Sequence, residues 1–371
     1  MNIHKNVKSS YRTLRRTLSN NRLFDYWWLL EQEVDSWSVW VSLPLSRRIW
    51  LWRHGYTSLN GKLYDFDGEP AETFLSELQR KRFYERINER HRYLLDDKLS
   101  QHWMLADHPT HRPTAFGLVR RGYVHRVPGT ERSGPPRPVS DWFPEQLRTE
   151  SPLVLKQLRG TGGKEVIVCR YEDGRFLLDG EELSEERLCD RLRELPSYLV
   201  TEFVDQHDYA DELYPHSTNT MRIVTLWDDE AEELLTPVAV HRVGTERSRP
   251  VDNFSSGGVA AEIDLETGEL GAAAQYPFSG DVQWYSTHPD TGSEIEGAVV
   301  PEWNSVRETV ERIARENSHI PVLGWDIVVN GENEPVIIEV NTGTGVQFIQ
   351  VHRPLLQDER VASIVSRTLQ E

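Results

Sequence analysis

The pattern of apolar and polar positions changes near residue 151, and the change predicts two kinds of structure. Before it, charged residues recur at the short spacings of a solvated helix, most clearly over Glu72–Tyr93. After it, short runs rich in Val, Ile and Leu are separated by turn residues, as in antiparallel sheets with intervening helices. The predicted strands are Leu153–Lys156, Glu165–Arg170, Tyr198–Val204, Met221–Trp227, Val238–Val243, Asp326–Val329 and Val336–Val340, and the predicted helices are Ser184–Leu192 and Asn304–Asn317. The fold class is therefore α+β.

Four regions follow from this pattern. Residues 1–95 are predicted to be helical and are rich in aromatic residues. Residues 96–150 form a connecting segment in which the Pro, Arg, Gly and His of 107–150 predict irregular structure and short strands. The β-rich part divides into 151–205 and 206–371.

Composition narrows the functional classes. The formal net charge of -17 argues against a protein that coats nucleic acid. The chain has seven lysines and 35 arginines. This bias indicates either adaptation to high salt (a halophilic source) or a genome that favours Arg codons. The two cysteines, Cys169 and Cys189, match no metal or redox spacing, and the polar, basic start is no secretory signal. We therefore expect a cytoplasmic protein with reduced thiols.

The first 24 residues carry six Lys and Arg and no acid, and tryptophans follow from Trp27 to Trp52. A basic stretch beside aromatic residues can contact an anionic membrane surface weakly. A helical cap whose tryptophans pack on the main body is the favoured interpretation.

The strongest candidate site lies near the C-terminus, in two apolar runs joined by the polar turn 330–333. This arrangement predicts a hairpin. Because side chains alternate between strand faces, Glu339 and Asn341 share one face, and Asp326 at the head of the partner strand can face them. Two carboxylates and an amide oxygen form a ligand set that suits Mg²⁺ bound to phosphate oxygens. An amphipathic hairpin with its polar residues in water is the alternative.

A glycine-rich turn follows the apolar run that ends in Lys156. Gly160, Gly162 and Gly163 allow backbone N–H groups to approach a phosphate, so the turn can act as a flap. It is not a Walker loop, because Lys164 is followed by glutamate and a predicted strand. A plain glycine hairpin explains the turn equally well.

The run Tyr198–Val204 ends in an acid and leads into a polar linker that contains His207. The backbone of Glu202, Phe203 and Val204 can pair with an adenine edge, and the Glu202 carboxylate can accept from its exocyclic amine. A solvent-facing glutamate on an edge strand is the alternative.

Two arginines, Arg222 and Arg242, lie on neighbouring predicted strands, and the loop Asp252–Gly258 follows them. The planar guanidinium fork suits carboxylate or phosphoryl oxygens. Surface salt bridges are the plainer explanation in so acidic a chain.

Taken in order, these features resemble the layout of the ATP-grasp superfamily. Residues 221–345 are similar to its glutamate-ligase branch, and almost the whole chain past residue 50 resembles the sugar-transfer-associated ATP-grasp group. The runs that carry the resemblance are Leu51–Tyr56, Leu95–Lys98, Glu202–His207, Ser217–Arg222, Asn253–Gly258, His288–Gly292 and the final hairpin. The resemblance implies two α+β subdomains, 151–205 and 206–371, that clasp ATP, with 96–150 as the segment before them.

The resemblance also implies the cofactors ATP and Mg²⁺ and a role for each candidate. Nucleotide contacts would come from Lys98, Lys156, Gly160, Gly162, Gly163, Glu202, Phe203, Val204 and His207; metal ligands would be Asp326, Glu339 and Asn341; catalytic residues would be Arg222, Arg242 and Asn253. One position departs from the pattern, because Gly324 stands where several ligases carry arginine. Stabilisation of the transferred phosphoryl group would then fall to the remaining arginines.

The implied reaction is that of an ATP-dependent carboxylate–amine ligase. A small-molecule carboxylate would become an acylphosphate, and an amine would then displace phosphate. A uronic acid that receives an amino acid, in the modification of a polysaccharide precursor, is the sugar-linked example. A kinase that phosphorylates a hydroxyl and a nucleotide-binding regulator without turnover are the alternatives.

Overall fold

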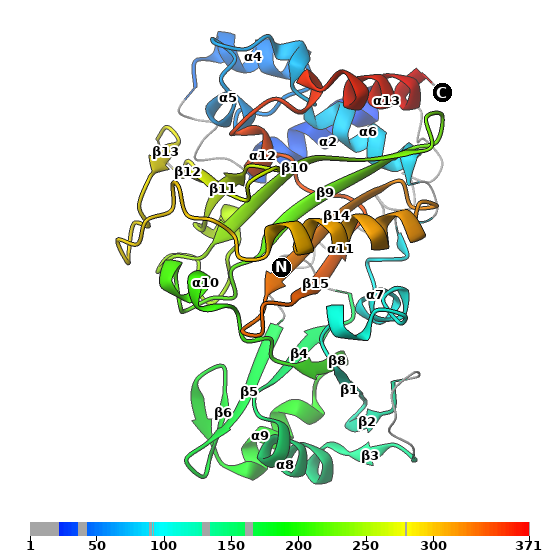
Figure 1. The fold of residues 1–371 in the computed structure, drawn as a ribbon, viewed down its shortest axis with the longest axis vertical. Coiled ribbons are helices and arrows are strands. Elements are labelled where there is room, and N and C mark those ends of the chain that lie inside the picture. Colours follow the sequence, from blue (N-terminus) through cyan, green and yellow to red (C-terminus); the bar gives the residue numbers. More distant parts are fainter. Residues whose placement is uncertain are drawn as a thin grey trace. The chain divides into compact units, whose positions relative to one another are not determined.

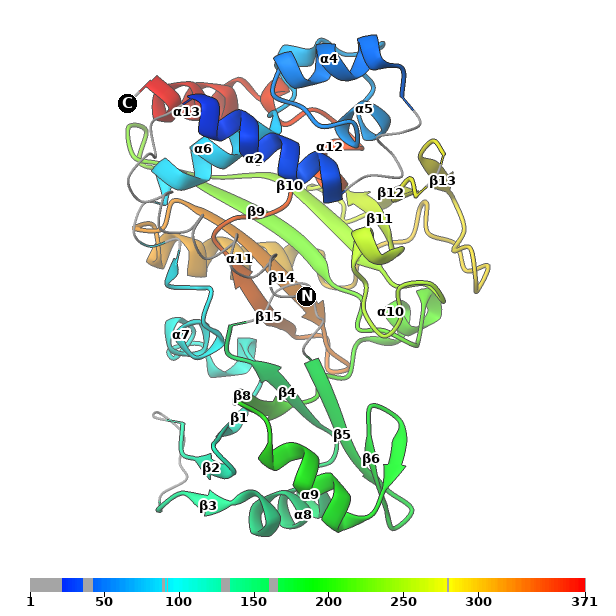
Figure 2. The ribbon, with the colours of Figure 1, turned by 180° about the vertical axis from the view of Figure 1, so that it is seen from behind.

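The computed structural model describes residues 22–35, 43–88, 91, 93–127, 134–159, 166–278 and 280–370. They fall into two compact units (Figures 1 and 2). The first unit combines Met1–Phe83 with Pro277–Gln283 and Gln350–Glu371, and the second holds Tyr84–Tyr276 and Trp284–Ile349. The glycine flap and the basic N-terminal stretch lie outside the described residues.

The first unit is helical. Its elements are α2 (Arg22–Asp35), α4 (Leu45–Arg53), α5 (Asn60–Leu63), η1 (Ala71–Thr73), most of α6 (Glu77–Ile87), η5 (Leu355–Gln357) and α13 (Glu359–Gln370). Helix α6 begins at Glu77 and not at the predicted Glu72 because Ser76 and Gln79 form a capping box at its start. The Ser76 hydroxyl accepts from the Gln79 backbone N–H (3.2 Å), and the Gln79 side-chain oxygen Oε1 accepts from the Ser76 N–H (2.9 Å).

The second unit contains an eight-stranded sheet. In spatial order its strands are β3 (Arg137–Pro138), β2 (Tyr123–His125), β1 (Ala115–Arg120), β8 (Ser197–Glu202), β4 (Leu153–Gln157), β5 (Val166–Glu172), β6 (Arg175–Leu178) and β7 (Glu181–Leu183). The pairs on either side of β8 and β4 are antiparallel. Helices α8 (Val139–Glu150) and α9 (Glu185–Arg193) bury Phe143, Leu147 and Leu188 in the core of this sheet.

The second unit also contains a seven-stranded sheet. Its order is β13 (Gln283–Tyr285), β12 (Leu270–Gln275), β11 (Val259–Ile263), β10 (Glu233–Val243), β9 (Met221–Asp228), β14 (Val322–Val329) and β15 (Pro335–Asn341). Helix α11 (Trp303–Glu316) lies across one face (Figure 1) and buries Val306, Val310 and Ile313 against it. The remaining short elements are α7 (Lys98–Met104), η3 (Pro109–His111), α10 (Asp208–Leu213), η4 (Phe254–Ser256) and α12 (Gln347–Gln350).

The predicted α+β class, the antiparallel sheets and the helical character of the N-terminal region are confirmed. The prediction for 107–150 was partly wrong, because α8 is a regular helix despite Pro144. Its residues Val139, Trp142 and Phe143 turn one apolar face onto the sheet, and this burial outweighs the hydrogen bond that the proline removes. No helix in the described part of the chain is long and apolar enough to cross a membrane.

Candidate active site

Strand β14 brings the predicted acids and arginines to one face of the seven-stranded sheet. Asp326 is the fifth residue of β14 rather than its first, and it pairs with Arg222 of β9 on one side and with Glu339 of β15 on the other. Directly opposed residues on neighbouring strands point to the same face. Asn341, two residues beyond Glu339, places Nδ2 3.5 Å from Asp326 Oδ2.

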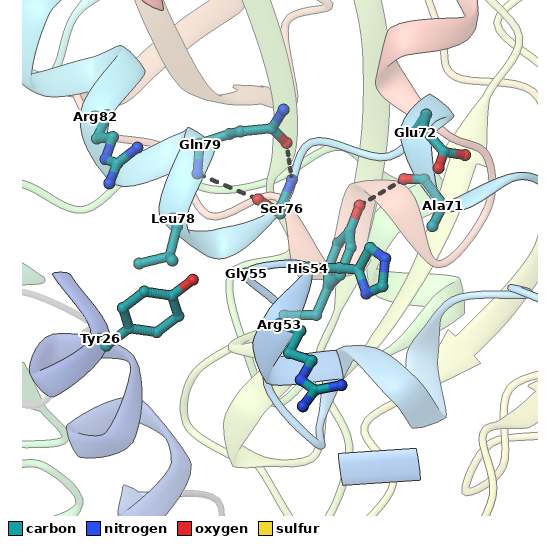
Figure 3. A pocket seen from close by; sticks show the side chains of 11 residues that line it. Tyr26, Arg53, His54, Gly55, Ala71, Glu72, Ser76, Leu78, Gln79 and Arg82 are labelled. Carbon is teal, nitrogen blue, oxygen red and sulfur yellow. Dashed lines mark hydrogen bonds between the residues drawn. The ribbon is translucent and has the colours of Figure 1, made fainter. Parts of the chain in front are cut away.

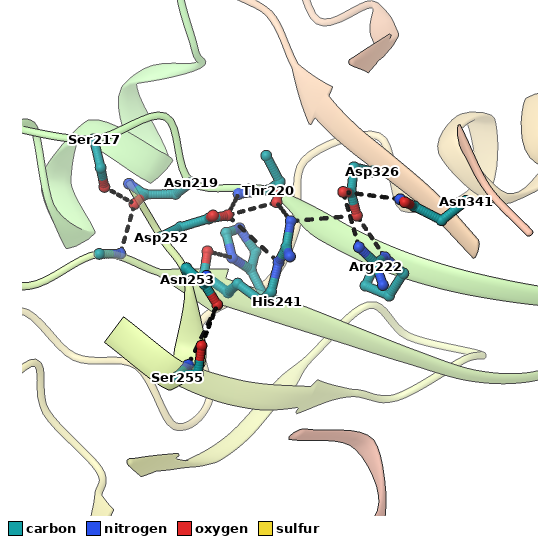
Figure 4. Close-up of polar contacts among 12 residues, drawn as sticks. Ser217, Asn219, Thr220, Arg222, His241, Asp252, Asn253, Ser255, Asp326 and Asn341 are labelled. Atoms are coloured by element: carbon teal, nitrogen blue, oxygen red, sulfur yellow. Dashed lines mark hydrogen bonds and ion pairs between the residues drawn. The ribbon is translucent and has the colours of Figure 1, made fainter. Parts of the chain in front are cut away.

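Asp326 is held by both candidate arginines. Figure 4 shows Arg222 and Asn341 beside its carboxylate. Arg222 makes a forked contact, with Nε 2.5 Å from Oδ1 and Nη2 2.9 Å from Oδ2. Arg242 Nη2 lies 3.2 Å from Oδ1. Burial would raise the pKa of Asp326, but the two guanidiniums outweigh it and hold that pKa below its ordinary value. The carboxylate is therefore ionised and orients both arginines.

Gly324 stands where several ATP-grasp ligases carry arginine, and its surroundings are crowded. A Cβ at this position would lie 2.9 Å from Thr344 Cβ and 3.3 Å from Arg222 Cδ. Thr344 Oγ1 accepts from Arg222 Nη1 at 2.5 Å. The Phe348 ring lies 5.5 Å from the Arg222 guanidinium carbon and 5.9 Å from that of Arg242. Arg222 and Thr344 thus fill the space that a side chain at 324 would need.

Lys98 reaches the same hairpin from helix α7. Asp97 caps this helix by accepting from the Leu99 N–H (3.0 Å), which makes Lys98 its first residue. Lys98 Nζ lies 2.6 Å from Glu339 Oε1. Gln101 ties the helix to β15, because its Oε1 accepts from the Val340 N–H at 3.2 Å. The helix and the hairpin therefore fix the spacing of this ion pair.

Lys156 reaches the hairpin from β4 of the other sheet. Its Nζ lies 3.4 Å from the Ile338 carbonyl oxygen. Burial, with a smaller contribution from nearby Lys98, lowers the pKa of Lys156 to about 8, although Glu339 and Asp326 act in the opposite direction. A small cavity of about 40 Å³ opens beside it, lined from both sheets by residues that include Leu199, Thr201, Ile337 and Ile338.

The predicted hinge lies where β8 ends. Glu202 Oε1 accepts from the Thr114 N–H at 2.8 Å, so one carboxylate oxygen has a partner within the protein. The linker then pairs with the tip of the hairpin, where the His207 N–H donates to the Val329 carbonyl (2.9 Å). His207 Nδ1 also accepts from the Tyr209 N–H at 3.1 Å and caps α10. Phe203 and Val204 lie between these anchors, both partly buried.

Asn253 faces its own loop. Its Oδ1 accepts from the Ser255 N–H (3.3 Å) and hydroxyl (3.2 Å) and begins the short turn η4. The preceding Asp252 is buried and accepts from Thr220, through N–H (2.9 Å) and hydroxyl (2.5 Å). Burial raises the pKa of Asp252 despite the Arg242 guanidinium 3.5 Å away. The loop is thereby fastened to Arg242 through Asp252, and the role of Asn253 stays a prediction.

Sequence reasoning missed Thr220, Asp252, Thr344 and Phe348. Thr220 stands two residues before Arg222, and Asp252 directly precedes Asn253. Their closeness in sequence to a candidate residue was the available signal. The last two follow the hairpin, and only the fold brings them onto Arg222.

The described residues fit a nucleotide with a divalent cation. Lys98, Lys156, Arg222 and Arg242 outnumber the acids beside them, as a triphosphate requires. No group of three or more His, Cys, Asp or Glu within the described ranges could hold a metal. The predicted set has two carboxylates and one amide, which suits Mg²⁺ that keeps several waters.

Two antiparallel sheets that face each other across lysines, arginines and paired carboxylates define an ATP-grasp fold. The model of the sugar-transfer-associated ATP-grasp family matches residues 78–362, so the chain belongs to that family. Membership confirms the predicted fold and the predicted cofactors, ATP and Mg²⁺.

No curated protein matches the chain in sequence. Among solved structures, D-alanyl-alanine synthetase A of Vibrio cholerae is similar, with 10% identity and a TM-score of 0.42 over 75% of this chain and 66% of that one. A RiPP-associated ATP-grasp ligase of Chryseobacterium gregarium has 11% identity and a TM-score of 0.39 (82% and 72% covered). An L-amino acid ligase of Bacillus licheniformis has 11% identity and a TM-score of 0.35 over 73% of this chain and 48% of that one. This chain therefore spans about half of that protein's length.

Proposed function

We propose that the chain is an ATP-dependent ligase that joins a carboxylate to an amine through an acylphosphate. The observation that carries the proposal is the arrangement around Asp326, where two arginines share one buried carboxylate and face the Lys98–Glu339 pair. A carboxylate and a phosphoryl group both carry negative charge, and bringing them together requires such a cluster of cations.

The nucleotide end is assigned to residues of both sheets. Lys98 and Lys156 bind phosphate oxygens, and Ile338 forms an apolar wall for the base beside the hinge at Glu202. Glu202 keeps one carboxylate oxygen for the exocyclic amine while the other accepts from Thr114. Bound Mg²⁺, held by Asp326, Glu339 and Asn341, would neutralise phosphate charge in this cluster.

The reacting end is assigned to the arginines. Arg222 and Arg242 orient the substrate carboxylate, and their charge stabilises the γ-phosphoryl group as one carboxylate oxygen bonds to phosphorus and ADP leaves. An amine then attacks the acyl carbon, phosphate leaves, and an amide forms. A proton leaves the amine nitrogen in this step. Asn253 and the loop that begins with Asp252 cover this end in the proposal.

The charge of the site favours a carboxylate over a hydroxyl as the attacking group. A hydroxyl needs a general base, whereas a carboxylate is already ionised. Among the described acids of the cluster, Asp326 is engaged by two arginines and Asp252 by Thr220 and Arg242. Both carboxylates already have partners within the protein, and the two guanidiniums that hold the pKa of Asp326 down make it a poor acceptor for a hydroxyl proton, which supports the ligase over a kinase.

The substrates we propose are small molecules, with a sugar-linked carboxylic acid as the first class to screen, as the sugar-transfer association of the family suggests. We propose the cytoplasm as its compartment, because ATP is available there and Cys169 and Cys189 are both free.

A hydroxylamine trap tests the reaction. The protein, ATP, Mg²⁺ and hydroxylamine are incubated with uronic acids and amino acids, at low and high salt, and ADP and hydroxamate are measured together. The proposal predicts a hydroxamate in proportion to ADP, and Glu339→Gln lowers the rate on the order of 10²-fold or more. Glu334→Gln, in the turn of the same hairpin and exposed, is the matched control. A phosphorylated hydroxyl without hydroxamate would show a kinase instead.

A further inference from the structure

The first unit contains a cavity of about 410 Å³ that the proposed ligase chemistry does not use. Figure 3 shows it between the first turns of α2, the end of α4, η1 and the start of α6. Its volume lies within the range of small-molecule sites in proteins. All of its lining residues belong to this unit.

Residues Arg53–Tyr56, at the end of the run Leu51–Tyr56, form one wall of the cavity. Leu51 and Tyr56 are buried anchors, and the Tyr56 hydroxyl lies within hydrogen-bond distance of the Ala71 (2.6 Å) and Phe74 (2.9 Å) carbonyl oxygens. Gly55 has a φ of +83°, and a Cβ there would lie 2.9 Å from Ser76 Oγ. The turn is therefore held tightly, although the residues just before it are exposed.

Those exposed residues are basic and line the cavity (Figure 3). The Arg53 side chain forms no hydrogen bond or ion pair with another residue of the described ranges. His54 Nδ1 lies 2.7 Å from the Trp50 carbonyl oxygen and donates to it, because a carbonyl only accepts. The ring is thereby fixed at the end of α4. Arg53 thus has its full donor fork available to a ligand.

The charged residues of the cavity lining are two arginines, Arg53 and Arg82, and one glutamate. Arg82 lines the cavity, and its Nη2 lies 2.6 Å from Asp25 Oδ2, while Lys81 Nζ lies 2.7 Å from Oδ1 of the same carboxylate. Glu72 is the acidic residue of the described lining, and it is exposed. Together with Arg53 the cavity therefore favours an anion.

An apolar surface stands beside these cations. Tyr26, which is 45% exposed, and the buried Leu78 both line the cavity (Figure 3). An aromatic face of this kind packs against a flat or ring-shaped body. One wall thus binds charge, and the other offers contact area for a ring.

We propose that this cavity binds a small organic anion, a single ring that carries one carboxylate or phosphate group. Arg53 binds the acidic group in a forked contact, and Tyr26 packs on the ring. The site is separate in composition from the ligase site, and each proposal can fail without the other.

Calorimetric titration of the full-length protein tests the site, with glucuronate, glucose 6-phosphate and uncharged glucose as probes. We expect saturable binding of at least one charged probe and none of glucose, and the pair of charged probes tells carboxylate from phosphate. Arg53→Gln should weaken the binding by about tenfold or more, the loss expected for a charge-assisted contact. Tyr26→Ala should weaken it as well. Both side chains are exposed, so the variants should melt like the parent protein.

Two controls locate the binding. Arg367→Gln removes a partly exposed positive charge from α13 of the same unit, at a residue that does not line the cavity, and should leave the affinity unchanged. Lys156→Gln, in the nucleotide site, should also leave it unchanged. The proposal is overturned if no probe binds, if glucose binds as well as the charged probes, if Arg53→Gln behaves like Arg367→Gln, or if Lys156→Gln abolishes binding.

Discussion

Lys156 makes nucleotide binding depend on pH in a way that one substitution can remove. Burial lowers the pKa of Lys156 from its ordinary 10.5 to about 8 in the free protein. A bound triphosphate favours the charged lysine, so the pKa of Lys156 rises in the complex. Above about pH 8 the Lys156 amine of the free protein is mostly uncharged, so the protein must take up a proton from solution when it binds ATP.

Proton linkage sets the size of the effect. If the complex keeps the proton, the affinity for ATP falls by up to about tenfold for each pH unit above 8. Between pH 7 and pH 9 the expected loss is about tenfold, or about 1.4 kcal/mol. In Lys156→Arg the guanidinium stays charged throughout, so the affinity should be nearly constant over this range.

Calorimetry in two buffers of different ionisation enthalpy measures both the affinity for ATP and the number of protons taken up on binding. At pH 9 the wild type should take up close to one proton per ATP bound, and Lys156→Arg close to none. Lys62→Arg, whose lysine pairs with the exposed Asp281 in the first unit, serves as the control and should follow the wild type. A flat wild-type profile, or an equal fall in Lys156→Arg, would refute this assignment of Lys156.

Two further substitutions test the packing behind the site. Asp326→Asn leaves the buried Arg222 and the partly buried Arg242 without their shared charge and should lower the free energy of unfolding by roughly 3–5 kcal/mol in denaturant melts. The surface change Asp281→Asn should be indistinguishable from wild type, and an equally small effect at Asp326 would contradict the ion-pair account. Gly324→Ala pushes a methyl group to 2.9 Å from Thr344 Cβ and should cost about 1–3 kcal/mol together with a loss of ADP release. Gly331→Ala, where a Cβ meets open space, should change neither, and equal behaviour of the two alanines would show that the space at 324 is not needed.

Three of the strands that carry the candidate site were predictable because their signal is local. Apolar runs bounded by turn residues locate β4, β9 and β15 to within a residue or two at each end. Helix α8 was missed because Pro144 and the prolines before it suggest irregular structure. Its stability comes from the sheet it covers, which local sequence does not reveal.

The partners of the candidate residues were less predictable than the residues themselves. The forked contact of Arg222 with Asp326 depends on the pairing of β9 with β14, strands separated by more than 90 residues of chain. Thr344 and Phe348 carry no motif and join the arginines only through the path of the chain after β15. The glycines Gly160, Gly162 and Gly163 lie outside the described residues, so the flap stays a prediction.

The Mg²⁺ dependence of ATP binding tests the central claim most directly. In the proposed site Glu339 is both a metal ligand and the partner of Lys98. Wild-type protein should bind ATP at least about tenfold more tightly with Mg²⁺ than with a chelator. Glu339→Gln should keep metal-free binding and lose that gain, while Glu334→Gln keeps both. A gain that persists undiminished in Glu339→Gln would contradict the assignment of this hairpin as the metal end of an ATP site.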